Sequence, residues 1–408
     1  MISEAPPRPV GSAAPQASLW RVAWIFVIFC ALMLFARDLM ATRFGGDGSI
    51  ADVALWGRDF VNVYTSGALT HAGRLDILYD VPAYQAYQLQ LFDAALVSHN
   101  YSYPPVTLFY TWAFALLPYW AALILWLAGT GALFWWAARP YLREVRLPGW
   151  VALAAPACLV NLWAGHYGFL IGALWLGAWT LLPRRPVLAG MLIGCLVVKP
   201  HLAILVPLVL LVRRDWVAFG AAAATSIGLV LLSVLLFGPE IWLTYLGDTA
   251  LRQAEMVDDV GAFFLTMMPT VAPALSSLGA STVLALLVQG AVALWAVTLL
   301  VRHLPKDSRA AGLATATATF LVLPYAFAYD MTVVGLAGLL LFRRAVMAPP
   351  GPYHVLYALA AVLPMALIYF NLVHLPLAPL LLAFQLLALT GRVPDRREDA
   401  QQGAAVPG

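Results

Sequence analysis

Charged residues are what this sequence most lacks. Only 11% of its 408 residues are Asp, Glu, Lys or Arg, whereas 62% are hydrophobic. A soluble domain carries about 25% charged residues, so this composition excludes an ordinary soluble protein. The net charge of +3 is small and scattered along the chain, which argues against nucleic acid as a partner.

Cysteine and the common cofactor motifs are also scarce. The three cysteines (Cys30, Cys158 and Cys195) all lie in apolar runs, which indicates neither a disulfide framework nor a metal cluster. The sequence contains no Walker motif, and no GxGxxG follows a strand, so no nucleotide site is expected. We therefore expect no cofactor and no metal site, although a divalent metal requirement is left open.

Long apolar runs are abundant. They recur from Leu19 to Leu389, and a helix that spans a bilayer needs about 20 apolar residues. The sequence therefore predicts an all-α polytopic integral membrane protein with about 12 spans. The expected spans cover residues 19–41, 119–138, 149–163, 166–182, 186–198, 200–212, 215–237, 281–302, 309–325, 329–343, 353–371 and 375–391, and residues 104–117 are expected to form a re-entrant or surface helix.

The two ends of the chain differ from this core. The first 18 residues are rich in Pro, Ala and Ser and predict a disordered tail, and residues 392–408 predict a second one. The run LWRVAWIFVIFCALMLFA has the length of a signal peptide but lacks a small-residue cleavage site, so we interpret it as an uncleaved first span. The transmembrane domain is thus expected over residues 19–391.

The distribution of charge predicts the orientation. With both termini in the cytoplasm, 17 of the 23 Lys and Arg residues fall inside, and 13 of the 20 acidic residues fall outside. Positive residues prefer the cytoplasmic side of a membrane protein. We therefore expect a multi-pass protein of the cell (inner) membrane, whose long loops 42–103 and 238–280 and whose active site lie on the external or periplasmic side.

One polar stretch follows the first span, RDFVNVYTSGALTHAGRLDILYD at residues 58–80. Asp59 has two interpretations: the cap of a loop helix, since Asp is a favoured N-cap, or a general base at the membrane surface. Partial burial beside aromatic residues such as Tyr64 would raise its pKa, whereas Arg58 would lower it.

A second polar group interrupts the apolar run GCLVVKPHLAILVPL. Lys199 precedes a proline, which ends a helix at this point, and His201 follows. Lys199 is one of only two lysines in the chain. Its side chain either extends toward water or binds phosphate, for which a lysine serves as a point charge.

Other ionisable residues stand at predicted outer helix ends. His166 in NLWAGHYGFL and Asp330 in FLVLPYAFAYD are candidates, because ionisable groups at membrane depth are costly and often functional. A helix-end residue without function is the alternative. Arg252 belongs to the second long loop, whose carboxylates we interpret mainly as a solvated surface.

The aromatic tract HNYSYPPVTLFYTWAFALLP allows two interpretations. Its aromatic side chains, Tyr103 among them, match the belt that anchors proteins at a membrane interface. They match equally well a surface that stacks on a sugar. The residues alone do not decide between the two.

Five blocks in order resemble glycosyltransferase family 87. They are DFVNVYTSGALTHAGRLDILYD, YSYPPVTLFYTWAFALLP, NLWAGHYGFL, AGMLIGCLVVKPHLAILVPLVLLVRRDW and LPYAFAYDMTVV. His166 stands where many members carry Gln, and Asp330 stands in a block that carries histidine in some relatives. The resemblance implies a GT-C fold, a multi-helix bundle with a long external first loop that contains short helices.

The resemblance also implies a function. The family contains mannosyltransferases that use polyprenyl-phosphate-mannose, so the chain would transfer a hexose from a polyprenyl-phosphate donor to a hydroxyl of a glycolipid or glycan. Asp59 would be the base and Lys199 would lie near the donor phosphate. A transporter or flippase of a lipid-linked substrate is the alternative, because many spans and broken helices also fit transporters. A membrane scaffold is a third possibility.

Overall fold

The computed structural model describes residues 13–41, 43–44, 50–51, 57, 59–92, 99–249, 265–348 and 351–393. Most of these residues are helical. The strands β1 (Arg43–Phe44) and β2 (Ile50–Ala51) pair with each other over two residues each. The expected all-α class is therefore confirmed for the described chain.

The first half of the chain contains both long and very short helices. Its elements are α1 (Ala13–Ala41), α2 (Phe60–Ala72), η1 (Leu75–Ile77), α3 (Val81–Leu91), η2 (Pro105–Thr107), α4 (Leu108–Phe114), α5 (Tyr119–Glu144), α6 (Val151–Ala154), α7 (Pro156–Ala164), α8 (Gly168–Leu181), α9 (Pro186–Gly194), η3 (Cys195–Val198), η4 (Pro200–Ala203) and α10 (Val206–Arg213).

The second half is built in the same way. Its elements are α11 (Trp216–Phe237), α12 (Glu240–Thr244), η5 (Tyr245–Thr249, a π-helical turn), α15 (Val271–Ser276), α16 (Thr282–Arg302), α17 (Ser308–Val322), η6 (Ala328–Asp330), α18 (Thr332–Met347), α19 (His354–Leu372) and α20 (Ala378–Leu389).

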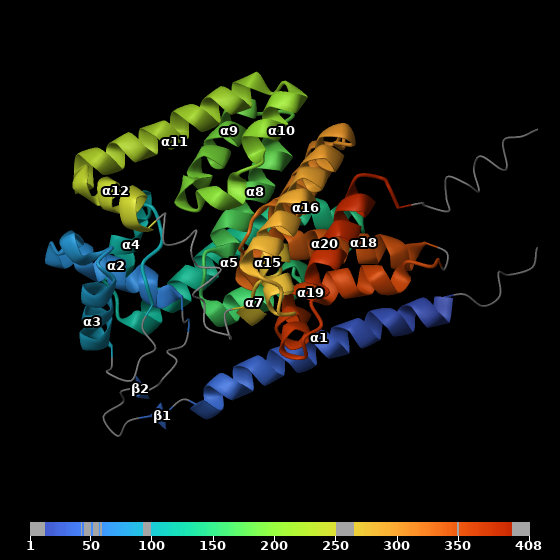
Figure 1. The fold of residues 1–408 in the computed structure, drawn as a ribbon, viewed down its shortest axis with the longest axis horizontal. Helices are drawn as coiled ribbons and strands as arrows, with labels where there is room; N and C mark the ends of the chain where they lie inside the picture. The colour runs from blue at the N-terminus through green and yellow to red at the C-terminus, as the bar shows by residue number, and fades with distance from the viewer. Residues whose placement is uncertain are drawn as a thin grey trace, which may run out of the picture.

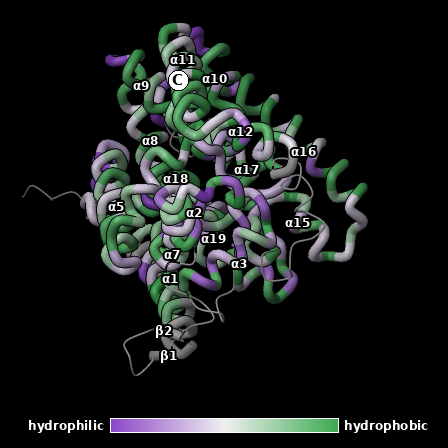
Figure 2. Tube along the Cα trace, turned by 90° about the vertical axis from the view of Figure 1, so that its left-hand side faces the viewer, coloured by the Kyte–Doolittle hydropathy of each residue, from purple (hydrophilic) through white to green (hydrophobic). Residues whose placement is uncertain are grey.

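Four helices of the described chain, α5, α11, α16 and α19, are long and apolar enough to cross a membrane. Five shorter apolar helical segments accompany them, and hydrophobic residues dominate most of the helices in Figure 2. The chain is therefore an all-α membrane protein. The expected count of 12 spans is not confirmed, because several expected spans are short or broken helices.

Three short helices of the long connections, α2, α3 and α12, lie together with α4 at one end of the molecule (Figure 1). The rings of Tyr79 and Tyr245 are 5.6 Å apart, and those of Phe109 and Phe237 are 5.7 Å apart. The first long connection therefore contacts the beginning of the second at η5, whereas α15 of the second connection packs against α16.

Three interruptions of the helices bring polar residues into the interior. Helix α7 ends at Gly165, whose φ of 70° is in the left-handed region that favours glycine. Lys199 separates η3 from η4, because Pro200 cannot continue the helix. The third interruption lies between α17 and α18 and contains η6.

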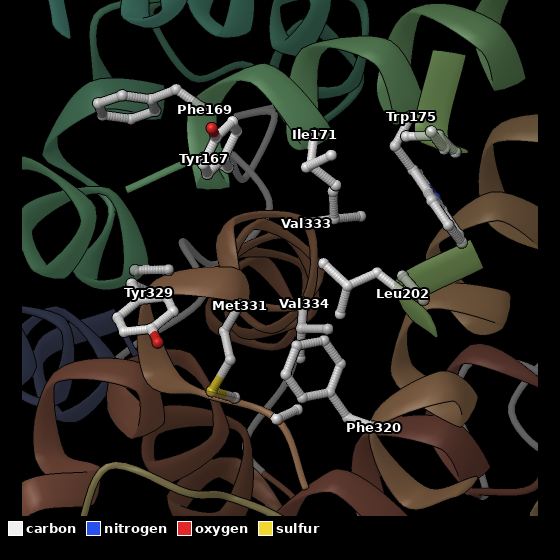
Figure 3. Packing of buried hydrophobic residues seen from close by; sticks show 14 of the residues in the cluster. Tyr167, Phe169, Ile171, Trp175, Leu202, Phe320, Tyr329, Met331, Val333 and Val334 are labelled. Atoms are coloured by element: carbon white, nitrogen blue, oxygen red, sulfur yellow. The ribbon is translucent and has the colours of Figure 1, made fainter. Parts of the chain in front are cut away.

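Helices α8 and α18 pack closely beside these interruptions. Figure 3 shows Ile171 of α8 and Val333 of α18 pointing toward each other within the buried cluster. Close approach requires a glycine at the start of α8, because a Cβ on Gly168 would lie 2.2 Å from the carbonyl oxygen of Tyr329. Gly168 therefore fixes the distance between α8 and the η6 segment.

Replacing Gly168 with alanine is expected to destabilise the protein by about 1–3 kcal/mol, the usual cost of overpacking a core. The measurement is the apparent melting temperature of the purified protein in detergent. Gly228→Ala in α11 is the matched control, since a Cβ there meets no atom within 4 Å, and it should leave the melting temperature nearly unchanged. Equal melting temperatures for both variants would contradict the packing described here.

Candidate functional site

A buried ion pair joins two of the helix interruptions. The Lys199 ammonium lies 2.6 Å from Oδ1 and 2.7 Å from Oδ2 of Asp330, although the residues are 131 positions apart. Both residues are buried, with exposed fractions of 6% and 5%. Burying an isolated charge there would cost much free energy, and the contact between the two opposite charges offsets that cost.

His166 lies against this pair. Its Nδ1 is 3.6 Å from Oδ1 of Asp330, too far for a hydrogen bond. Its Nε2 is 2.7 Å from the hydroxyl of Tyr103, and its ring stacks on Tyr329 with a centroid distance of 4.0 Å. The Lys199 ammonium also faces the Tyr329 ring at 5.3 Å, a cation–π distance. These five residues form what we call the Lys199 cluster.

A backbone hydrogen bond holds Asp59 close to His166 of the Lys199 cluster. Its N–H donates to the carbonyl of Ala164 at 2.9 Å, two residues before His166. The approach depends on two glycines, because a Cβ on Gly165 would lie 2.8 Å from the Cα of Gly57. Asp59 therefore lies beside the interruption that carries His166.

The side chain of Asp59 is not a helix cap. Asp59 occupies the N-cap position of α2, but its carboxylate makes no capping hydrogen bond. It is 17% exposed, and its Oδ1 lies 4.0 Å from Nε2 of His99. Of the two interpretations from the sequence, the capping one is therefore wrong, and a carboxylate that water can reach remains.

Electrostatics connect Asp59 with the Lys199 cluster. The Asp59 carboxylate interacts electrostatically with the Lys199 ammonium and with the hydroxyls of Tyr103 and Tyr329. Burial raises the pKa of Tyr103 well above its usual value, and Asp59 and Asp330 raise it further. Tyr103 is thus a neutral hydroxyl that can donate or accept a hydrogen bond.

The remaining predicted site residues make no hydrogen bond to the Lys199 cluster that the structure records, or lie outside the described residues. The His201 ring is half-buried and lies 5.9 Å from that of Tyr325. The Tyr64 hydroxyl donates to the carbonyl of Leu117 at 2.9 Å, so this side chain packs α2 onto its neighbours. Arg58 and Arg252 lie outside the described residues.

The site prediction omitted two residues that the fold places there. Tyr329 contacts both His166 and Lys199, and its position next to Asp330 in the sequence was the available signal. His99 lies beside Asp59, and nothing in its local sequence indicates this, since the two are 40 positions apart. Over the described ranges no group of three His, Cys, Asp or Glu residues could hold a metal ion.

The Tyr103 hydroxyl offers a test of the cluster. Tyr103→Phe removes its bond to His166 and should lower about tenfold the sugar transfer that the sequence resemblance implies, with a loss of stability of about 1 kcal/mol. Tyr141→Phe is the control, because its buried hydroxyl donates to the carbonyl of Leu176 at 3.1 Å in another part of the fold. Similar stability losses with an activity loss in Tyr103→Phe alone would assign the cluster to function, whereas equal activities would assign it to packing.

Comparison with known proteins adds one finding. The family model described as glycosyltransferase family 87 matches residues 101–327, more than half of the chain. The matched segment contains Tyr103, His166 and Lys199, ends three residues before Asp330, and begins after Asp59. No curated protein and no solved structure matches the chain significantly.

Proposed function

Because the chain belongs to glycosyltransferase family 87, and is therefore a membrane glycosyltransferase, we propose that it transfers a hexose from a polyprenyl-phosphate donor to an acceptor hydroxyl at the external face of the membrane. Asp59 acts as the general base. The observation that carries this proposal is the position of Asp59, a partly exposed carboxylate whose backbone N–H binds Ala164 beside the Lys199 cluster.

The donor class follows from the side of the membrane. Nucleotide sugars are confined to the cytoplasm, so a sugar used outside must arrive on a lipid carrier. The external location rests on the distribution of Lys and Arg, which favours cytoplasmic termini and external long loops. The gathering of α2, α3, α4 and α12 at one end supports a single active face (Figure 1).

Asp59 removes the proton of the acceptor hydroxyl. The acceptor oxygen bonds to the anomeric carbon, the bond from that carbon to the phosphate oxygen breaks, and its electron pair stays on the phosphate. The proton ends on the Asp59 carboxylate. A positioned base contributes about 10²–10⁴-fold in rate, and a lipid phosphate is already a fair leaving group.

Lys199 binds the donor phosphate. A lysine ammonium has three N–H donors, and Asp330 takes two of them at 2.6 and 2.7 Å. The third is directed to a phosphate oxygen in the bound state. Tyr103 and His166 provide neutral polar groups beside it for the sugar hydroxyls, and His201 remains a candidate near Lys199. Arg58 and Arg252, which lie outside the described residues, remain candidates from the sequence alone.

The test is transfer itself. Membranes containing the protein are incubated with radiolabelled polyprenyl-phosphate hexoses, and the labelled product is separated from the donor. Labelled glycolipid or glycan that depends on the protein supports the proposal. Movement of the labelled lipid across sealed vesicles without transfer of the sugar would instead support the transporter, which the family match disfavours.

A further inference from the structure

The Lys199 ammonium is neutralised before any donor arrives. Asp330 contacts it through both carboxylate oxygens, at 2.6 and 2.7 Å, and Asp59 acts on it from a greater distance. His166 and His201 also interact with Lys199, and an imidazole of ordinary pKa is neutral at pH 8. The ammonium and the two carboxylates thus carry one negative charge in total at that pH.

Sugar transfer changes the charge of the lipid phosphate. The donor is a phosphodiester with a single negative charge. When its bond to the anomeric carbon breaks, the electron pair stays on the oxygen, and the product is a phosphomonoester with a charge of about −1.5 to −2 at pH 7. The product is therefore more strongly repelled by nearby carboxylates than the donor is.

We propose that Asp330 makes the Lys199 site selective for a singly charged phosphodiester over a more highly charged phosphomonoester, so that the spent lipid phosphate is expelled after transfer. The inference rests on the proposed function, because it takes Lys199 as the phosphate ligand. A lone lysine would have the opposite preference, since a point charge attracts the larger charge more strongly.

Asp330 is better suited to this role than Asp59. Its side chain is 1% exposed, whereas that of Asp59 is 17% exposed, so water and salt screen its field less. Asp59 also takes the acceptor proton and is neutral immediately after transfer. Asp330 takes no proton in the transfer step and stays in contact with the Lys199 ammonium. Both carboxylates repel the product once Asp59 has released its proton to water.

Two lipids with the same tail test this inference without knowledge of the sugar. Farnesyl phosphate is a phosphomonoester and methyl farnesyl phosphate is a phosphodiester. Their affinities for the purified full-length protein in detergent are measured by calorimetry at pH 8. The wild type should bind the diester at least as tightly as the monoester. Asp330→Asn should shift the ratio of affinities about tenfold toward the monoester.

Asp76→Asn is the control, because this exposed carboxylate pairs with Arg74 in the first long loop and should leave the ratio as in the wild type. A wild type that binds the monoester more tightly than the diester, or an unchanged ratio in Asp330→Asn, overturns the inference. If Asp330→Asn yields no folded protein, the ratio of the wild-type affinities for the diester and the monoester alone tests the inference. The proposed function fails separately, if neither lipid binds and no polyprenyl-phosphate hexose is used.

Discussion

Asp59→Asn is expected to lower the rate of sugar transfer by about 10²–10⁴-fold, the contribution of a positioned general base. Asparagine has nearly the same shape as aspartate but cannot accept the proton of the acceptor hydroxyl. Helix α2 should still begin at the same residue, because the Asp59 carboxylate makes no capping hydrogen bond and asparagine is also a favoured N-cap. The measurement is the initial rate of product formation at saturating donor.

The amount of Asp59→Asn protein in the membrane and its melting temperature should match those of the wild type. Asp80→Asn is an informative companion, since Asp80 caps α3 by accepting the N–H of Ala83 at 3.2 Å. Asparagine can still accept that bond, so this variant should retain its activity. If Asp59→Asn transfers sugar at the wild-type rate, Asp59 is not the base.

The sequence predicted the long helices well, because a helix that crosses a bilayer needs a run of about 20 apolar residues and such a run is easy to recognise. The expected spans 215–237, 281–302 and 353–371 correspond to α11, α16 and α19 within two residues at each end. The expected span 149–163 is instead divided into α6 and α7 at Pro156. Mean hydropathy does not register such a break, since proline interrupts a helix through its missing N–H rather than through polarity.

The candidate site was predictable only in part. The Lys-Pro pair predicted a cation at a helix break, and Lys199 lies there. Its partner was not predictable, because the contact with Asp330 joins segments 131 residues apart and depends on how α8 and α18 pack. Tyr64 was expected beside the base because it is near Asp59 in sequence, but its hydroxyl binds the backbone at Leu117.

Removing one member of the Lys199–Asp330 pair is expected to have a large effect on stability. Lys199→Met leaves a buried carboxylate without its cation, and Asp330→Leu leaves a buried ammonium, so each change should cost about 3–5 kcal/mol. Replacing both residues together removes both charges and fills the same volume. The double variant should therefore be much more stable than either single variant, and close to the wild type.

The double variant separates a structural role of the pair from a catalytic one. If Lys199 serves only to neutralise Asp330, transfer activity should return together with the melting temperature. If Lys199 binds the donor phosphate, the folded double variant should remain at least about 100-fold less active, because no cation is left to hold a lipid phosphate. The double-mutant cycle is measured once by thermal unfolding in detergent and once by transfer rate. Recovery of both quantities would remove Lys199 from the donor site and leave Asp59 as the residue on which the mechanism depends.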